Sequence, residues 1–178
     1  MASAAAAAEG DRLIFLDSDG VLANGRSHVL DAEELGSSGA LWDELVVASE
    51  PDADGDWPPP LERLCLANLL RLAAATRALV VLSTSWRLPV CAALRQYLVA
   101  QLQTLGVEVV GDTPDLGGEG RGAEVSAFLR DYTRDFGRTV AAFVILDDNH
   151  RESFEQHGFG EQFVETLMMG GDAYVGKH

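Results

Sequence analysis

Two aspartates, Asp17 and Asp19, directly follow the apolar run 13–16 and precede Gly20. Four consecutive apolar residues are too few for a buried helix and are typical of a strand that is covered on both faces. Open α/β sheets bind ligands just beyond the carboxyl ends of such strands. Two carboxylates in that position are costly to keep without a cation or a chemical role. Gly20 has no side chain, so the backbone there can turn sharply and approach a ligand closely.

Two simpler interpretations of this Asp-x-Asp-Gly pattern stay open at this point. In the first, Asp17 and Asp19 only cap a turn after an edge strand, since a short motif is a hypothesis until its context fits. In the second, the residues begin a calcium loop, but the later carboxylates of such a loop are missing after Gly20. A chemical role requires polar partners at the ends of other strands.

Polar side chains do follow two later apolar runs of the sequence. They are three hydroxyls after residues 78–82 and two carboxylates after residues 140–146: Ser83, Thr84, Ser85, Asp147 and Asp148. The carboxyl ends of parallel strands meet at one edge of a sheet, so we expect these groups to converge with the first aspartate pair. Four carboxylates in one pocket require compensating positive charge. Their oxygen atoms suit Mg²⁺, and the sequence offers no cysteine or histidine set for zinc.

Strand and helix patterns alternate through most of the chain. We expect strands at 13–16, 78–82, 107–110, 140–146 and 163–167, and helices at 61–76, 89–105, after Arg121, and at 151–157. This alternation predicts an α/β, Rossmann-like three-layer sandwich with a central, mostly parallel five-stranded sheet and helices on both faces. In this prediction, Gly106 stops the second helix.

The length of 178 residues predicts one domain with a substantial core. We expect residues 1–10, which are rich in alanine and lack the charged start of a secretory signal, to form a disordered tail. Residues 11–178 would then form the domain. The irregular stretch 23–60 would be a small insertion after the first strand, and a loop of that length is usually functional or mobile.

The composition limits the partners of the protein. The formal net charge is −15, and Lys177 is the only lysine. Such a surface repels a nucleic acid backbone and an anionic membrane, so we expect neither long nucleic acid nor a membrane as a partner. Cys65 and Cys91 are expected to be reduced core thiols in a cytoplasmic protein, and a disulfide between them is the alternative. The oligomeric state stays open.

At these strand ends the chain resembles the haloacid dehalogenase (HAD) superfamily, over about residues 11–170. The sequence Asp-Ser-Asp-Gly-Val-Leu at 17–22 matches the first motif of the family, Asp-x-Asp-Gly-(Val/Thr)-Leu. The sequence Ser-Thr-Ser-Trp-Arg at 83–87 resembles the second motif, in the form found in a branch related to HAD domains of RNA-repair proteins. Asp147 and Asp148 match the fourth motif. The third motif is usually a lysine, for which Arg121 is the natural substitute.

The resemblance implies a Mg²⁺-dependent phosphatase that acts through an aspartyl-phosphate. Asp17 would attack phosphorus, and Asp19 would protonate the leaving group and then activate water. Mg²⁺ would lie between Asp17, the main-chain carbonyl of Asp19, Asp147 and Asp148, where it lets an anionic nucleophile approach a phosphate. The expected site is rather open because residues 23–60 leave room only for a small cap. The substrate would be a small phosphorylated molecule or a phosphorylated macromolecule.

The remaining candidates would contact the phosphoryl group or the substrate. A hydroxyl of Ser83 or of Thr84 would hold a phosphoryl oxygen, and the sequence leaves the choice open. Arg121 would add a fixed cation. Gly20, Ser85 and Arg87 are candidate substrate contacts. Arg87 could equally brace its loop by pairing with an acid, and we expect the neighbouring Trp86 to be a packing anchor.

Two other functions remain as alternatives on the same fold. A haloacid dehalogenase-type hydrolase is disfavoured by Asp19, because a halide leaves without a proton. A non-catalytic module that binds a phosphorylated ligand or a protein is disfavoured by the intact pair of Asp17 and Asp19, since an inactive site would be free to lose either one.

Overall fold

The computed structural model of the chain describes residues 10–23 and 61–166. The expected tail therefore lies almost wholly outside the described residues, as do residues 24–60 of the expected insertion. Leu167, the last residue of the expected fifth strand, also lies outside them. In the described part of the chain, no helix is long and apolar enough to cross a lipid bilayer.

Five strands form one sheet, in which every pairing is parallel. They are β1 (Asp11–Leu16), β2 (Leu79–Leu82), β3 (Val109–Asp112), β4 (Val140–Asp147) and β5 (Phe163–Glu165). Their order in the sheet is β3-β2-β1-β4-β5, so β1 lies at the centre. The pairs β1–β2, β1–β4, β2–β3 and β4–β5 are all parallel.

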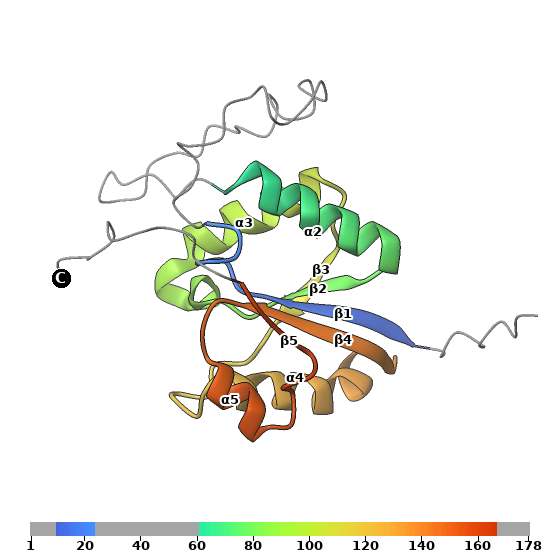
Figure 1. The fold of residues 1–178 in the computed structure, drawn as a ribbon, viewed down its shortest axis with the longest axis vertical. Helices are drawn as coiled ribbons and strands as arrows, with labels where there is room; N and C mark the ends of the chain where they lie inside the picture. The colour runs from blue at the N-terminus through green and yellow to red at the C-terminus, as the bar shows by residue number, and fades with distance from the viewer. Residues whose placement is uncertain (1–9, 24–60, 167–178) are drawn as a thin grey trace, which may run out of the picture.

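Helices cover both faces of this sheet. They are α2 (Arg63–Thr76), α3 (Ala92–Thr104), α4 (Arg121–Phe136) and α5 (Arg151–Gln156). Figure 1 shows α2 and α3 on one face and α4 and α5 on the other. This arrangement confirms the predicted α/β, Rossmann-like three-layer fold.

Several boundaries differ from the sequence prediction by one to three residues, and two of these differences have a clear local cause. The helix expected from Pro89 begins at Ala92, because Pro89–Cys91 form a 3₁₀ turn after the extended residue Leu88. The amide of Cys91 donates to the carbonyl of Leu88 at 2.8 Å, an i→i−3 bond, and such 3₁₀ turns are frequent at the start of an α-helix.

The third strand begins at Val109 and not at Val107, because Val107 belongs to the capping turn that follows α3. The amide of Val107 donates to the carbonyl of Leu102 at 2.9 Å, and the amide of Gly106 donates to Gln103 at 2.9 Å. Gly106 has a φ of +75°, which completes a Schellman motif. The predicted stop at Gly106 is therefore right. Val107 packs with Leu102 in the core that lies under α2 and α3.

The register of the strands determines which polar residues meet at the edge. In the register, Leu16 aligns with Leu82 and with Leu146. All three leucines pack in the cluster on the α2 and α3 side, whereas Phe15, Val81 and Ile145 pack on the α4 and α5 side. Side chains alternate along a strand, so the next residue of each strand turns toward α4 and α5. Those residues are Asp17, Ser83 and Asp147.

The start of α4 is fixed against α5 by a close backbone contact. The amide of Gly122 donates to Ser153 Oγ at 3.0 Å. A Cβ at position 122 would overlap the carbonyl of Ser153, so only glycine allows this approach. The contact fixes the position of Arg121, the preceding residue, relative to the sheet edge.

Candidate active site

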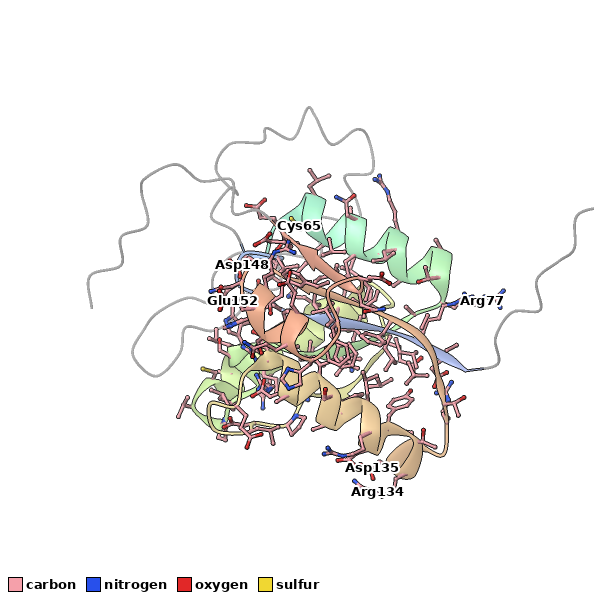
Figure 2. The ribbon with its side chains drawn as sticks, turned by 60° about the horizontal axis from the view of Figure 1, so that its bottom comes forward. Cys65, Arg77, Arg134, Asp135, Asp148 and Glu152 are labelled. Atoms are coloured by element: carbon pink, nitrogen blue, oxygen red, sulfur yellow. The ribbon has the colours of Figure 1, made fainter. Side chains whose placement is uncertain are left out.

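Three of the predicted metal ligands meet at the carboxyl end of the sheet. Asp17, Asp147 and Asp148 each offer a carboxylate oxygen, and these oxygens lie within 4.8 Å of one another. Figure 2 shows Asp148 at this end of the molecule, with Arg77, which precedes β2, at the opposite end. The predicted convergence of the first and fourth strand ends is therefore present in the structure.

Asp147 supports the interpretation of this cluster as a cation site. Its Oδ1 accepts a hydrogen bond from the amide of Asn149 at 2.8 Å. Its Oδ2 is buried and has no hydrogen-bond partner among the described residues. A buried carboxylate oxygen without a partner is costly, and a divalent cation would satisfy it.

The electrostatics of the site agree with this interpretation. Burial, followed by the charge of Asp147, raises the pKa of Asp17 to about 7. Burial also raises the pKa of Asp147 to about 6. Two such groups resist ionisation together unless positive charge is brought between them. The residues that are present therefore fit a divalent cation.

Asp19 lies in the same loop but has a different partner. Its Oδ2 accepts a hydrogen bond from the indole Nε1 of Trp86 at 3.0 Å. Asp19 is exposed as a whole residue, but partial desolvation of its carboxylate raises its pKa, against the opposing effect of the Trp86 hydrogen bond. The Asp19 carboxylate is not one of the three grouped carboxylates. Coordination of a metal by the main-chain carbonyl of Asp19 stays a prediction.

The structure distinguishes the two hydroxyls that the sequence left open. Thr84 Oγ1 is 2.6 Å from Ser18 Oγ and accepts a hydrogen bond from the amide of Trp86 at 3.3 Å. Ser83 Oγ is buried and has no hydrogen-bond partner among the described residues. The Thr84 side chain also hydrogen-bonds Asp17 and acts to lower the pKa of that carboxyl, so the hydroxyl of Thr84 is engaged within the protein.

Gly20 brings the backbone close to the acidic cluster. It has a φ of +71°, and a Cβ there would overlap the carboxylate of Asp148. The backbone of Gly20 thus closely approaches Asp148, which is a predicted metal ligand and not the substrate. Its contact with substrate stays a prediction.

We expect Gly20→Ala to weaken binding of Mg²⁺ at least about tenfold, because outer contacts that orient a ligand have effects of that size. The added methyl group must displace Asp148. The matched control is Gly117→Ala, which has a similar φ of +61° but nothing within 4 Å of the added Cβ. The control measures the cost of backbone strain alone. Titration of both variants with Mg²⁺ would contradict this account if their affinities were equal.

Arg87 makes several contacts within the protein. Its Nη2 is 2.7 Å from Glu124 Oε2, its Nη1 donates to the carbonyl of Thr84 at 2.6 Å, and its Nε donates to the carbonyl of Thr113 at 2.9 Å. The side chain of Arg87 is only 5% exposed. These contacts match the bracing role that was considered for Arg87. Its contact with substrate stays a prediction.

Arg121, the first residue of α4, supplies the second guanidinium near the site. Its Nη1 lies 3.4 Å from Glu124 Oε2, and its side chain is 13% exposed. The charge of Arg121 acts to lower the pKa of both Asp17 and Asp147, although burial outweighs it. A cation therefore lies within electrostatic reach of the acidic cluster, at the position expected to replace the usual lysine.

Three polar contacts of the site were not found by the sequence analysis. Trp86 was expected only to pack, but an indole N–H that is buried needs an acceptor, and this requirement could have suggested Asp19. Glu124 stands three residues after Arg121, a helical spacing that could have suggested their pairing. No sequence signal indicated that Ser18 would pair with Thr84.

Comparison with protein families gives one result for the chain. The family model described as the HAD domain in Swiss Army Knife RNA repair proteins matches residues 13–171. The matched range contains Arg121 and the three strand ends that carry the polar groups of the site. No curated protein and no solved structure matches the chain.

Proposed function

Because the chain belongs to the HAD superfamily, in the branch of HAD domains from Swiss Army Knife RNA repair proteins, we propose that it is a Mg²⁺-dependent phosphatase that forms an aspartyl-phosphate on Asp17. The family supports a hydrolase-type domain. One observation carries the finer proposal. Three carboxylates are grouped as a cation site would require, while the fourth, on Asp19, is held apart by Trp86. The site therefore offers three carboxylates as cation ligands and a fourth, on Asp19, for proton transfer.

Asp17 would carry out the nucleophilic step. Its Oδ1 accepts a hydrogen bond from the amide of Ser18 at 2.8 Å, which orients the carboxylate. The other oxygen would attack phosphorus in line as the bond from phosphorus to the leaving oxygen breaks. Mg²⁺ held by Asp17, Asp147 and Asp148 would neutralise charge on the nucleophile and on the phosphoryl group.

Asp19 would move the protons in both steps. In the first step it gives its proton to the departing oxygen, and in the second it takes a proton from the water that attacks the aspartyl-phosphate. Its raised pKa favours the protonated form that the first step needs. The hydrogen bond from Trp86 holds its carboxylate in one place between these steps.

Ser83 and Arg121 would bind the phosphoryl oxygens. The buried hydroxyl of Ser83 has no partner among the described residues, whereas that of Thr84 is already paired with Ser18. This difference favours Ser83 as the phosphate-binding hydroxyl. Arg121 would supply positive charge as the transition state forms.

The net charge of −15 favours a small phosphorylated substrate, or a phosphorylated macromolecule other than long nucleic acid.

The test is the release of phosphate from an aryl phosphate, with Mg²⁺ and with a chelator. We expect turnover only with Mg²⁺, and a loss of about 10⁴-fold or more in Asp17→Asn. The matched control is Asp135→Asn, an exposed aspartate near the end of α4, which should keep turnover within about twofold.

Two further measurements on the same protein, with a 2-haloacid and with inorganic phosphate, could reject the proposal. Release of halide from a 2-haloacid without any requirement for metal would indicate a dehalogenase. Binding of inorganic phosphate without any turnover would indicate a non-catalytic module.

A further inference from the structure

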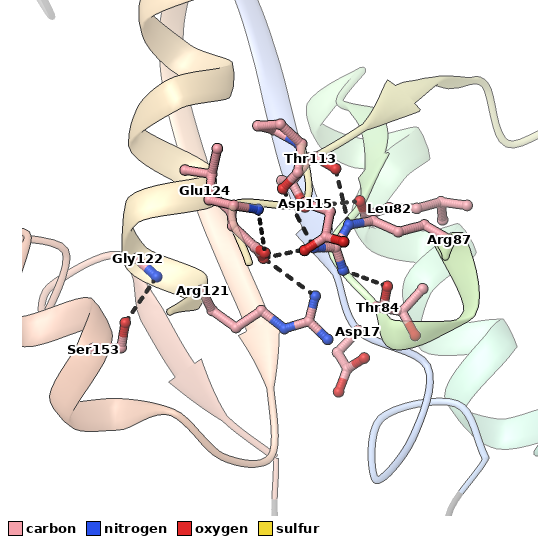
Figure 3. A network of polar contacts seen from close by, with 12 residues as sticks. Asp17, Leu82, Thr84, Arg87, Thr113, Asp115, Arg121, Gly122, Glu124 and Ser153 are labelled. Atoms are coloured by element: carbon pink, nitrogen blue, oxygen red, sulfur yellow. Dashed lines mark hydrogen bonds and ion pairs between the residues drawn. The ribbon is translucent and has the colours of Figure 1, made fainter. Parts of the chain in front are cut away.

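Glu124, on the first turn of α4, is a buried acid that faces two arginines from different elements. Its side chain is 8% exposed. The same oxygen, Oε2, lies 2.7 Å from Arg87 Nη2 and 3.4 Å from Arg121 Nη1. Its Oε1 accepts a hydrogen bond from the amide of Leu116 at 3.4 Å. Figure 3 shows the Glu124 carboxylate facing Arg87 and Arg121, with Asp17 on the far side of Arg121.

The Arg87 side of this network is rigid. The Arg87 guanidinium contacts the carbonyls of Thr84 and Thr113, which follow β2 and β3 respectively. It therefore ties two strand ends of the sheet edge together. Glu124 in turn ties α4 to this assembly through its shortest contact, which it makes with Arg87. The carboxylate of Glu124 is thus fixed relative to the strand ends.

The Arg121 side of the network faces the predicted reaction. Figure 3 shows the Arg121 guanidinium between the Glu124 carboxylate and Asp17. The backbone of Arg121 is fixed by its neighbour Gly122, which donates to Ser153 Oγ. What remains adjustable is the long side chain of Arg121, and Glu124 restrains it.

We propose that Glu124 is a positioning residue that holds the Arg121 guanidinium toward the phosphoryl group on Asp17. This inference rests on the proposed phosphatase function. Its physical basis is that Arg87 and Arg121 carry like charges close together and repel each other. A negative charge between them offsets this repulsion and keeps Arg121 in place. Without that charge, the partly exposed Arg121 side chain would turn away into solvent, because the buried Arg87 cannot move.

A double-mutant cycle distinguishes positioning from a general structural role. The aryl phosphate assay with Mg²⁺ would be run on the wild-type protein, Glu124→Gln, Arg121→Ala and the double variant. We expect Glu124→Gln to lower kcat about 10- to 100-fold, a partial loss of one charge-stabilising group, with little change in KM. In the Arg121→Ala background the same change should cost less than about threefold, because the group that it positions is absent.

A purely structural role of Glu124 predicts a different result. The fold loss from Glu124→Gln would then be equal in both backgrounds, and this outcome would overturn the inference. An inactive wild-type protein would overturn the proposed function and this inference together, so the two failures are distinguishable. The control is Asp112→Asn, which removes an ion pair with Arg95 at the end of β3 and should leave kcat unchanged.

Folding of the variants is checked by thermal melting followed by circular dichroism. If Glu124→Gln does not fold, the cycle is run with Glu124→Asp, which keeps the charge but moves the carboxylate back by one methylene group. A loss that depends on Arg121 supports the inference, and a loss that is the same in both backgrounds overturns it.

Discussion

Replacing Asp19 with asparagine is expected to lower turnover of an alkyl phosphate about 10³-fold, the usual scale of general acid–base catalysis. With an aryl phosphate, the substitution should slow formation of the aspartyl-phosphate much less, because an activated phenolate leaves without a proton. Hydrolysis of the aspartyl-phosphate should still be slow, since the residue that activates water is missing. The variant should therefore release a burst of phenolate, followed by slow turnover, in a stopped-flow measurement.

The fold of this variant should be intact, because asparagine keeps an oxygen that can accept the hydrogen bond from the Trp86 indole. Trp86→Phe is the complementary variant, which keeps the acid and removes the donor. We expect it to lower turnover less than Asp19→Asn does. Equal losses for the alkyl and aryl esters, with no burst, would contradict the role of Asp19 in proton transfer.

Without metal, the stability of the protein is expected to fall as the pH rises from about 4 to about 7. The folded-state pKa is raised to about 7 for Asp17 and to about 6 for Asp147, from an ordinary value of 3.8. Within this window the folded protein binds more protons than the unfolded chain, so the free energy of unfolding decreases with rising pH. At about 1.4 kcal/mol for each pKa unit, shifts of this size correspond to an expected decrease of several kcal/mol.

Mg²⁺ should reverse this loss, because it binds the ionised carboxylates of the folded protein. The measurement is the melting temperature at pH 5 and at pH 7.5, in chelator and in Mg²⁺. The gain from Mg²⁺ should be larger at pH 7.5 than at pH 5, and Asp147→Asn should reduce it. A melting temperature that does not respond to Mg²⁺ at pH 7.5 would argue against a cation at this cluster.

The fold could be predicted because its strongest signals are local. The apolar runs at 13–16 and 140–146 are too short for helices, and each is followed at once by acids. Alternation with amphipathic helices then implies parallel strands, whose carboxyl ends meet at one edge. The sequence alone therefore predicted that Asp17 lies together with Asp147 and Asp148.

The start of β3 shows why boundaries are harder to predict. Val107 is apolar and precedes more apolar residues, so it matches a strand pattern. The same residue also suits the apolar position after a helix that ends in a Schellman motif. Its amide donates to the carbonyl of Leu102, and Val107 therefore closes the capping turn after α3 instead of beginning β3. Only the hydrogen bond decides between these two uses of one apolar residue.

Contacts between distant residues account for most of what the sequence did not indicate. Trp86 and Asp19 are separated by 67 positions, and no local pattern pairs them. The choice between Ser83 and Thr84 depends on which hydroxyl already has a partner, and Ser18, which pairs with Thr84, lies 66 positions away in the chain. The sequence could supply the two candidate hydroxyls, but the contact between Thr84 and the distant Ser18 was needed to rank them.

The most direct test of the account is to locate the phosphoryl group during turnover. The protein would be mixed with an aryl phosphate and Mg²⁺, quenched in acid, digested and analysed by mass spectrometry. Asp19→Asn, in which the intermediate should accumulate, is the best variant for this measurement. We predict a phosphoryl group on Asp17. Active turnover without any phosphorylated peptide, or with the phosphoryl group on another residue, would contradict the central claim.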